Sequence, residues 1–592
     1  MISNHFQLPI SYNPSKMELA SNIVDDLELT STIHSSDLSN NPVSNTNTDA
    51  NANTDTNPNE DATEDLSMYN LILSPTHCFG KETLPLFSKH YTTDVPFLKD
   101  TQTLLKTYQP TDVEPFDFNP MKTCWGEIKG ETSFCEKYLY IDWEMGKFLN
   151  TNASFLQLMS YYNVTSPIFS LCLPILILIL PFFIIKLKGL HLNVTEYTEI
   201  LKSIISKHAV GKLFTNMSEV SFNEQIYLFI SAAFYIFSIY QNVLVCLKFY
   251  KNIYTINRYL STIKQYLGHT MKSMDNYLSI TEGLASYSPF NDAVRTHQKV
   301  LRECGDNLSA IQEFRLNWKS ILNIGNILKM FYLIYDNSVY NASFMFSFGF
   351  HGYVDNISGL IKNISNKKIN YADFNTTKKN GGAVFRETFY PSLMNEKHVV
   401  NDCDFGKHMM ITGPNASGKT TMLKSSLINI IFSQQFGCGC YSSANISPYK
   451  YIHCYLNIPD TSGRDSLFQA EARRCKSIID SISEHSDDTH FCAFDELYSG
   501  TNPDDAVASS IAFMNYMLKQ DNVTSILTTH YVKVCKKLSK HARIKNYRMK
   551  VKEGGDGTFE YTYILESGIS KIKGGLKVLS DMNYPTEILD KI

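Results

Sequence analysis

Apolar residues in the C-terminal third of the chain alternate between short continuous runs and helically spaced stripes. The continuous runs, at residues 409–412, 491–494 and 523–529, are typical of buried strands. Helical spacing follows the first run and returns between the second and the third. The apolar positions of these two stripes are Met422, Leu423, Leu427, Ile430 and Ile431, then Val507, Ile511, Met514, Met517 and Leu518. This order predicts an α/β fold around a doubly wound, mostly parallel sheet.

A glycine-flanked loop joins the first predicted strand to the helix that follows it. Its residues have the Walker A spacing of phosphate-binding loops: Gly413, Pro414, Asn415, Ala416, Ser417, Gly418, Lys419 and Thr420. In such loops backbone N–H groups and the helix N-terminus surround a triphosphate, the Lys reaches the β- and γ-phosphates, and the Thr hydroxyl binds Mg²⁺. We therefore predict a P-loop ATP site at residues 413–420 and the adjacent Thr421. A glycine-rich turn without a ligand is the alternative.

Two carboxylates and a histidine end the next two predicted strands. Asp495 and Glu496 follow the run at 491–494, and His530 follows the run at 523–529. Asp495 is expected to hold Mg²⁺ together with Thr420, and Glu496 is expected to polarise the attacking water. An imidazole at position 530 could sense the γ-phosphate, although a strand-end histidine is also a common surface residue. Together these residues predict ATP hydrolysis.

Several of these segments resemble the ATPase domain of the MutS family of mismatch-repair proteins. The phosphate loop and the segments 495–505, 528–531 and 563–585 are similar to motifs of that family. The segment 460–471 resembles the one whose serine, here Ser466, reaches the nucleotide of the partner subunit. His398 stands where the family usually has a Phe that stacks on adenine. The resemblance covers about residues 385–592.

The resemblance implies a dimer in which each nucleotide site is completed by the other subunit. Its cofactors would be ATP and Mg²⁺, and the partner would be a second copy or another MutS-like chain, with DNA as a potential ligand. In this scheme Ser466 acts in trans, and the other site residues act within one subunit. An ABC-type transporter ATPase shares the sheet and the strand-end residues, but residues 442–490 lack the Ser-Gly-Gly signature of that class.

Outside this region the composition indicates a polar tail and no overall basic field. The chain has 592 residues and a formal net charge of −4, so global charge does not indicate nucleic-acid binding, although a local basic groove is compatible with it. Residues 36–66 are rich in Ser, Asn, Asp and Thr, and we expect residues 1–66 to form a disordered tail without the pattern of a targeting peptide. Residues 67–165 would be a small N-terminal region of unknown fold.

Two long apolar stretches lie within residues 166–249. The first, at 167–185, has 19 uncharged residues, which as a helix would cover about 28 Å and so nearly cross the hydrocarbon of a bilayer. The second, at 226–247, is also uncharged but contains Ser, Gln and Asn. We expect membrane association through a two-pass helical hairpin. A pair of buried core helices is the alternative, and Pro174 and Pro181 also allow a kinked hairpin that does not cross.

Residues 250–375 have helical spacing and are expected to form a helical core before the ATPase domain at 385–592. In the MutS family such a core carries long levers and a DNA clamp, for which this part of the chain is too short. The family reads mismatches with a Phe-x-Glu element. The only candidate in the N-terminal region, Phe134 with Glu136, lacks the flanking residues of the family.

Two hypotheses for the function therefore remain. The first is a DNA mismatch-repair ATPase that clamps DNA as a dimer. The second is a membrane-anchored MutS-like ATPase whose dimerisation switches something other than mismatch recognition. The 13 cysteines show no zinc-type spacing and are typical of a reduced intracellular protein. We expect an intracellular, membrane-associated chain with its ATPase domain in the cytosol, or a location with DNA, such as the nucleus, if the repair hypothesis holds.

Overall fold

The computed structural model describes ten stretches of the chain and residue 582. The stretches are residues 2–31, 66–110, 113–189, 194–207, 222–311, 322–375, 381–458, 466–553, 559–572 and 584–589. They form two compact units: unit 1 comprises residues 1–115, 272–297 and 345–592, and unit 2 comprises residues 116–271 and 298–344. The region expected at 67–165 is therefore divided between the two units.

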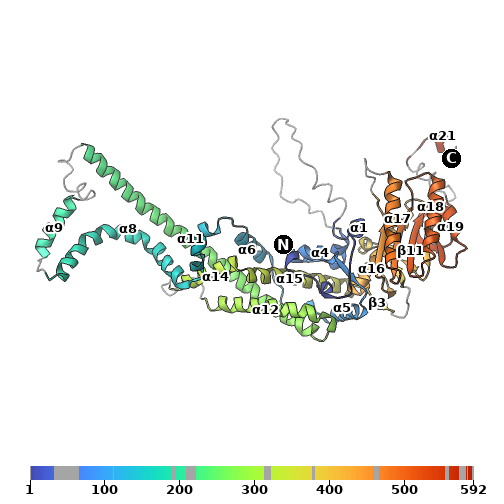
Figure 1. Cartoon of the computed structure of the whole chain (residues 1–592), viewed down its shortest axis with the longest axis horizontal. Helices are drawn as coiled ribbons and strands as arrows, with labels where there is room; N and C mark the ends of the chain where they lie inside the picture. The colour runs from blue at the N-terminus through green and yellow to red at the C-terminus, as the bar shows by residue number, and fades with distance from the viewer. Residues whose placement is uncertain are drawn as a thin grey trace. The chain divides into compact units, whose positions relative to one another are not determined.

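Unit 1 contains a six-stranded sheet in the order β13-β12-β6-β11-β10-β9 (Figure 1). The five strands from β12 to β9 run parallel to their neighbours, and β13 runs antiparallel to β12. The strands are β6 His408–Thr412, β9 Tyr451–Tyr455, β10 His490–Asp495, β11 Val523–Thr529, β12 Ile544–Glu553 and β13 Phe559–Ser567. The three apolar runs of the sequence are β6, β10 and β11, so the expected mixed α/β fold with a mostly parallel sheet is confirmed.

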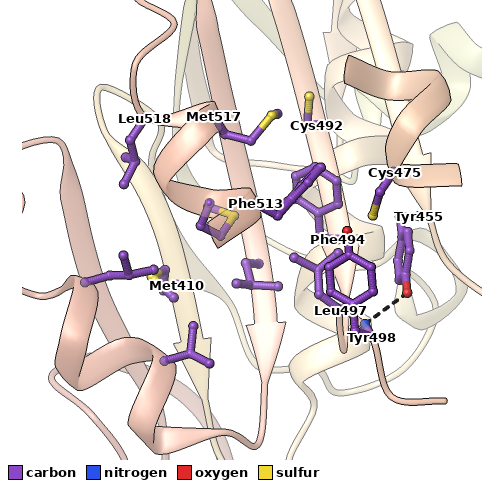
Figure 2. Packing of buried hydrophobic residues seen from close by; sticks show 14 of the residues in the cluster. Met410, Tyr455, Cys475, Cys492, Phe494, Leu497, Tyr498, Phe513, Met517 and Leu518 are labelled. Atoms are coloured by element: carbon purple, nitrogen blue, oxygen red, sulfur yellow. Dashed lines mark hydrogen bonds between the residues drawn. The ribbon is translucent and has the colours of Figure 1, made fainter. Parts of the chain in front are cut away.

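Helices cover both faces of this sheet. The helices are α16 Lys419–Phe436 on one face, and α17 Leu467–Glu484, α18 Pro503–Met517 and α19 Val532–Leu538 on the other. Figure 2 shows the second face, where Cys492 and Phe494 of β10 pack against Phe513 and Met517 of α18. The alternate residues of β10 face α16, which explains why its run is apolar at every position.

A second sheet lies beside α16 and has the order β5-β4-β8-β3-β7. Its strands are β3 Asn370–Phe374, β4 Gly382–Thr388, β5 Asn401–Asp404, β7 Cys438–Gly439 and β8 Ser443–Ser447. The 3₁₀ turn η6, Pro391–Leu393, lies in the connection from β4 to β5. This connection carries His398, so the second sheet brings that residue toward the start of α16.

Helix α16 is buried on all sides from Ser425 to Phe436, although polar residues occur along this part of the helix. Gln434 donates to the carbonyl oxygens of Thr92 and Tyr449, at 3.2 and 2.8 Å. Gln435 donates to the carbonyl oxygens of Phe87 and His90, at 2.8 and 2.9 Å. Each buried amide is therefore satisfied by backbone from a distant part of the chain, as a buried polar group must be.

The residues that cover α16 include the N-terminal segment, and the expectation of a disordered tail over 1–66 is wrong for residues 2–31. Phe6, Leu27 and Leu29 are at most 1% exposed. The prediction was wrong because the polar composition of residues 36–66 was extended to the whole segment 1–66, in which these apolar residues are a minority. Residues 32–65 lie outside the described residues. The elements of this part of unit 1 are η1 Ile2–Asn4, η2 Pro9–Tyr12, β1 Lys16–Glu18, α1 Ser21–Asp26, α3 Met68–Leu73, α4 Cys78–Phe87, β2 His90–Thr92, α5 Val95–Thr107 and η5 Ala285–Tyr287.

Unit 2 is helical in its described residues. Its elements are α6 Asn119–Lys129, α7 Phe134–Tyr138, η4 Glu144–Thr151, α8 Ala153–Leu187, α9 Val194–Lys207 and α14 Ile324–Asp336. Three further helices have residues in both units: α11 Phe222–Thr281, α12 Ser288–Ser309 and α15 Ser338–Ser365. The short helix α21, Thr586–Leu589, lies near the C-terminus. Residues 250–375 are thus largely helical, and their relation to a MutS core stays a prediction.

A glycine on α15 allows two segments of unit 1 to approach closely. A Cβ atom at Gly359 would lie 1.8 Å from the carbonyl oxygen of Leu73, the last residue of α3. We expect Gly359→Ala to lower the free energy of unfolding by about 1–3 kcal/mol, because α3 must shift. The matched control is Gly268→Ala in α11, where a Cβ atom meets nothing within 4 Å and alanine favours the helix. Equal thermal unfolding midpoints for the two variants would contradict the close approach.

Candidate active site

The loop between β6 and α16 is folded tightly around the start of the helix. Ala416 and Gly418 have left-handed backbone conformations, with φ of 60° and 93°. The hydroxyl of Ser417 donates to the carbonyl oxygen of Pro414 at 2.7 Å, and a Cβ atom at Gly413 would lie 2.7 Å from that hydroxyl oxygen. The loop therefore closes on itself directly before α16, whose first N–H groups have no acceptor within the helix.

Lys419 is the first residue of α16, and its ammonium group lies inside the loop. The side chain is 5% exposed, and Nζ donates to the carbonyl oxygen of Pro414 at 3.1 Å. Nζ also lies 3.5 Å from Oδ1 of Asn415 and 3.9 Å from Oε1 of Glu496. Burial lowers the pKa of Lys419, and the two carboxylates of Asp495 and Glu496 oppose that shift. A buried cation surrounded by a loop of backbone groups is suited to an anionic ligand.

Asp495 ends β10 and is held by two threonine hydroxyl groups. Thr420 donates from Oγ1 to Oδ2 of Asp495 at 2.8 Å, and Thr528 donates to Oδ1. Thr528 is the residue paired with Asp495 in the parallel register of β10 and β11. The Thr420 hydroxyl and the Asp495 carboxylate thus meet in direct contact, as expected for a shared Mg²⁺ site with oxygen ligands. Within the described residues there is no cluster of three or more His, Cys, Asp or Glu side chains that could hold a metal by itself.

Glu496 and His530 lie side by side at the ends of β10 and β11. Nδ1 of His530 is 3.5 Å from Oε1 of Glu496. Glu496 has a left-handed φ of 51°, and its N–H donates to the carbonyl oxygen of Thr528 at 3.0 Å. The hydrogen bond with His530 is the main cause that lowers the pKa of Glu496, with Lys419 also contributing, and it outweighs the opposing effect of burial. Glu496 is therefore an ionised carboxylate, as a base that acts on water must be.

The loop after Glu496 is fixed to helix α17 by a buried carboxylate that the sequence patterns missed. Glu471 is 2% exposed on α17. It accepts a hydrogen bond from the Ser499 hydroxyl at 2.9 Å on Oε1 and one from the Gly500 N–H at 3.2 Å on Oε2. A Cβ atom at Gly500 would lie 2.7 Å from Cγ of Leu467, so the loop also packs directly on the first turn of α17.

Ser466 precedes α17 and is not among the residues that meet at the loop 413–420. It is exposed, and its hydrogen bonds form a capping box with Gln469. Oγ of Ser466 accepts from the N–H of Gln469 at 3.3 Å, and the N–H of Ser466 donates to Oε1 of Gln469 at 3.0 Å. The neighbouring residues 459–465, which include the first half of the predicted segment 460–471, lie outside the described residues.

A cavity of about 490 Å³ adjoins the loop on the side of the second sheet. His398 lines it and stacks on Phe389, with ring centroids 4.2 Å apart and planes at 28°. Nδ1 of His398 lies within 3.0 Å of the carbonyl oxygens of Leu393 and Glu396, so this nitrogen carries the hydrogen and Nε2 of the neutral ring is an acceptor. The other lining residues are Thr388, Tyr390, Ser392, Lys397, Val399, Asn401, Gly418, Thr421, Met422, Ser425, Met549 and Tyr563.

Tyr563 closes this cavity beside the loop, and no sequence pattern indicated it as a lining residue. It has a left-handed φ of 57°, and its carbonyl oxygen accepts from Nδ2 of Asn401 at 3.0 Å. A Cβ atom at Gly418 would lie 3.1 Å from Cδ1 of Tyr563. The predicted residues Thr421 and His398 thus share one cavity with an aromatic ring at the rim of the loop. Its volume is in the range of small-molecule sites.

Comparison with known proteins finds one family over this part of the chain. Residues 409–592 match the family model MutS domain V. The chain is 28% identical over 204 residues to the DNA mismatch repair protein MutS of Chlorobaculum tepidum, which covers 33% of this chain and 22% of that protein. It is 26% identical over 217 residues to the protein of the same name from Fusobacterium nucleatum, which covers 36% of this chain and 23% of that protein. It is also 26% identical over 233 residues to DNA mismatch repair protein MSH3 of Coccidioides immitis, which covers 37% of this chain and 20% of that protein.

These matches confirm the resemblance to the MutS family for the C-terminal region. The chain spans about a fifth of the length of the curated relatives it matches. What those relatives do as whole proteins therefore does not pass directly to this chain.

Glu471 provides a test of how the loop after Glu496 is held. Glu471→Ala leaves the Gly500 N–H and the Ser499 hydroxyl without their acceptor, and we expect the free energy of unfolding to fall by about 2–3 kcal/mol. Glu471→Gln has nearly the same volume and keeps one oxygen acceptor, so its loss should be smaller. Urea unfolding of the two variants measures the difference. A Glu471→Ala variant as stable as the wild type would show that the loop does not depend on this carboxylate.

Proposed function

We propose that this chain binds MgATP at residues 413–420 and hydrolyses it as a dimer. One observation carries the proposal: two parallel strands and one helix bring an ammonium group, a hydroxyl, two carboxylates and an imidazole to the same loop. These groups belong to Lys419, Thr420, Asp495, Glu496 and His530. The match to MutS domain V supports it independently.

Each of these residues has a distinct role in the proposed reaction. The N–H groups at the start of α16 and the ammonium of Lys419 would bind the β- and γ-phosphates, whose negative charge favours the protonated lysine. Thr420 and Asp495 would hold Mg²⁺, which when bound offsets charge on the phosphates. Glu496 would orient a water molecule and accept its proton, and His530 would keep the Glu496 carboxylate ionised and aimed.

The cavity lined by His398 would take the nucleoside. Phe389 and His398 form a two-ring stack, and an adenine base could extend it. Nε2 of His398, the acceptor of the neutral ring, can receive a hydrogen bond from an amino group of the base. This arrangement supports His398 as a nucleotide-binding residue, although imidazole is a weaker stacking surface than phenyl.

The second copy of the chain would contribute Ser466. Because Oγ of Ser466 accepts from the Gln469 N–H, its hydroxyl hydrogen remains available to donate to a phosphate oxygen of the partner. The exposed N-terminus of α17 adds a partial positive charge at the same point. Hydrolysis would therefore be slow until two copies close on the nucleotide.

The names of the relatives favour a role in DNA mismatch repair as the first candidate. A specific observation favours the second candidate, a membrane-anchored switch. Phe134, the Phe-x-Glu candidate of the N-terminal region, is 1% exposed and stacks on Tyr335 with ring centroids 3.6 Å apart, so its ring is not free to enter DNA. Unit 2 instead exposes long apolar helices.

Nucleic acid distinguishes these two candidates. The hydrolysis rate is measured alone, with homoduplex DNA and with DNA that carries one mismatch. A rate that changes with the mismatch supports the repair role. Equal rates in the three conditions, at a salt concentration low enough to allow phosphate contacts, support a switch that does not read DNA.

Glu496→Gln provides the first test of the dimer. The amide cannot accept a proton from water, so ATP should bind without being hydrolysed and the closed dimer should accumulate. Light scattering after gel filtration should give twice the monomer mass with MgATP and the monomer mass without it. A monomer under both conditions would argue against a site shared between two copies.

Mixing two inactive variants tests the composite site directly. Lys419→Ala weakens nucleotide binding in one copy but keeps its Ser466, and Ser466→Ala keeps nucleotide binding but lacks the trans group. In the mixed dimer one site regains all its parts, so activity should return to roughly half that of the wild-type dimer. The control variant is Ser483→Ala, which changes a serine in the last turn of the same helix, α17. This variant keeps Ser466 and should be active by itself. No recovery in the mixture would contradict the trans role of Ser466.

A further inference from the structure

Most of the exposed large apolar side chains in the described part of unit 2 lie on two helices, α8 and α11. Among the described residues, one helix has the length and composition of a membrane span, Gln225–Thr281, with a mean hydropathy of 1.7 in its most apolar window. None of that window is buried. A core helix of a soluble protein can reach the same hydropathy, but it is buried by its neighbours, and the apolar window of this helix is not.

The exposed apolar side chains surround the first half of α11. They are Phe222, Ile226, Tyr227, Phe229, Ile230, Phe234, Ile236, Phe237, Tyr240, Val243, Leu244, Val245 and Leu247. Several are consecutive, so they cannot all lie on one stripe of a helix. A single partner helix would cover one stripe, whereas a helix that is apolar all round requires an apolar medium on every side.

Three side chains in the first half of α11 make polar contacts with α8. The Tyr235 hydroxyl donates to the carbonyl oxygen of Ser170 at 2.9 Å, and Nδ2 of Asn242 donates to Oγ of Ser170 at 2.5 Å. Sγ of Cys246 lies 3.7 Å from the carbonyl oxygen of Val164. Hydrocarbon offers no hydrogen-bond partners, so polar groups within a membrane span are expected to bond to a neighbouring helix, as these do. The order of the contacts also shows that the two helices run antiparallel, and Figure 1 shows them diverging toward α9.

The length and the flanks of this pair fit a bilayer. As helices, residues 226–247 of α11 span about 33 Å and the uncharged residues 167–185 of α8 span about 28 Å, both close to the thickness of bilayer hydrocarbon. Lys248 and Lys251 follow this stretch on α11, and Lys186 and Lys188 end α8, so positive charges stand where lipid headgroups would lie. Exposed aromatic side chains gather at the end where α8 begins and the apolar part of α11 ends: Trp143, Phe148, Tyr162, Tyr250 and Tyr254. Trp and Tyr are enriched at such interfaces.

We propose that α8 and the first half of α11 cross a lipid bilayer as two antiparallel spans. The chain before α8 and the chain after residue 247 emerge on one side of the membrane, and α9 lies on the other. Bilayer lipid, rather than a second copy of the chain, covers the apolar side chains, because they face all directions and leave no single stripe for a partner helix. The inference does not depend on the nucleotide site.

The test uses full-length protein incorporated into phosphatidylcholine vesicles. Wild-type protein should float with the vesicles and resist extraction at alkaline pH. The double variant Ile236→Asp/Phe237→Asp places charge in the span at two side chains that are 66% and 57% exposed, so no internal packing is lost. Its extraction-resistant fraction should fall at least about tenfold, because an Asp inside a span opposes insertion strongly. The matched control is Val339→Asp in α15, 55% exposed and outside the pair, which should behave as wild type.

A protease-protection measurement tests the two-pass arrangement on the same vesicles. In sealed vesicles with unit 1 outside, trypsin should cut after Lys264 and spare Lys202 of α9 until detergent is added. Three results would each overturn the proposal. They are release of the wild type from the vesicles at alkaline pH, wild-type protein that forms soluble oligomers and does not bind the vesicles, and cleavage at Lys202 without detergent. Lys419→Ala should float normally, so a failure of the nucleotide site cannot be mistaken for a failure of insertion.

Discussion

The parallel register of β6, β11 and β10 is the constraint on which the candidate active site depends. Thr412 pairs with Thr529, and Asp495 pairs with Thr528, so the three strands end at the same level. The loop 413–418, the carboxylates of Asp495 and Glu496, and His530 all follow these ends directly. A shift of one residue in this register would turn Asp495 to the other face of the sheet and break its bond with Thr420. The positions of the site residues therefore depend on strand pairing in the sheet more than on the conformation of any single loop.

Burial of α16 holds that arrangement in place. The helix carries Lys419 at one end and the two satisfied glutamines at the other, so its position is fixed by backbone groups of residues 87–92 and 449. The N-terminal segments are therefore part of the scaffold of the site. On the opposite face, the Glu471 carboxylate fixes the loop after Glu496 to α17, which begins next to Ser466.

The sequence was sufficient to predict those parts of the site where a motif of functional residues follows an apolar run typical of a strand. Asp495 and Thr420 were predicted as partners from motif spacing, and they are in contact. Other residues carried no such signal. Thr528 acts through strand register, Phe389 through its ring stack with His398, and Glu471 and Tyr563 through contacts between separate segments, none of which periodicity encodes. The partners of Gln434 and Gln435 could not be predicted either, because a sequence pattern gives polarity but does not indicate which segment will cover a side chain. Residues 2–31 were hidden by the polar stretch that follows them.

Equilibrium binding of MgATP tests the central claim most directly, because every other role assumes that the loop 413–420 holds a triphosphate. Titration of a fluorescent ATP analogue into the wild type, Lys419→Ala and Lys424→Ala separates the loop lysine from another lysine on the same helix. Loss of a buried charged hydrogen-bond donor costs about 1.5–3 kcal/mol, so we expect Lys419→Ala to bind roughly 10- to 150-fold more weakly and Lys424→Ala to bind as the wild type does. The same affinity in all three proteins would contradict the account.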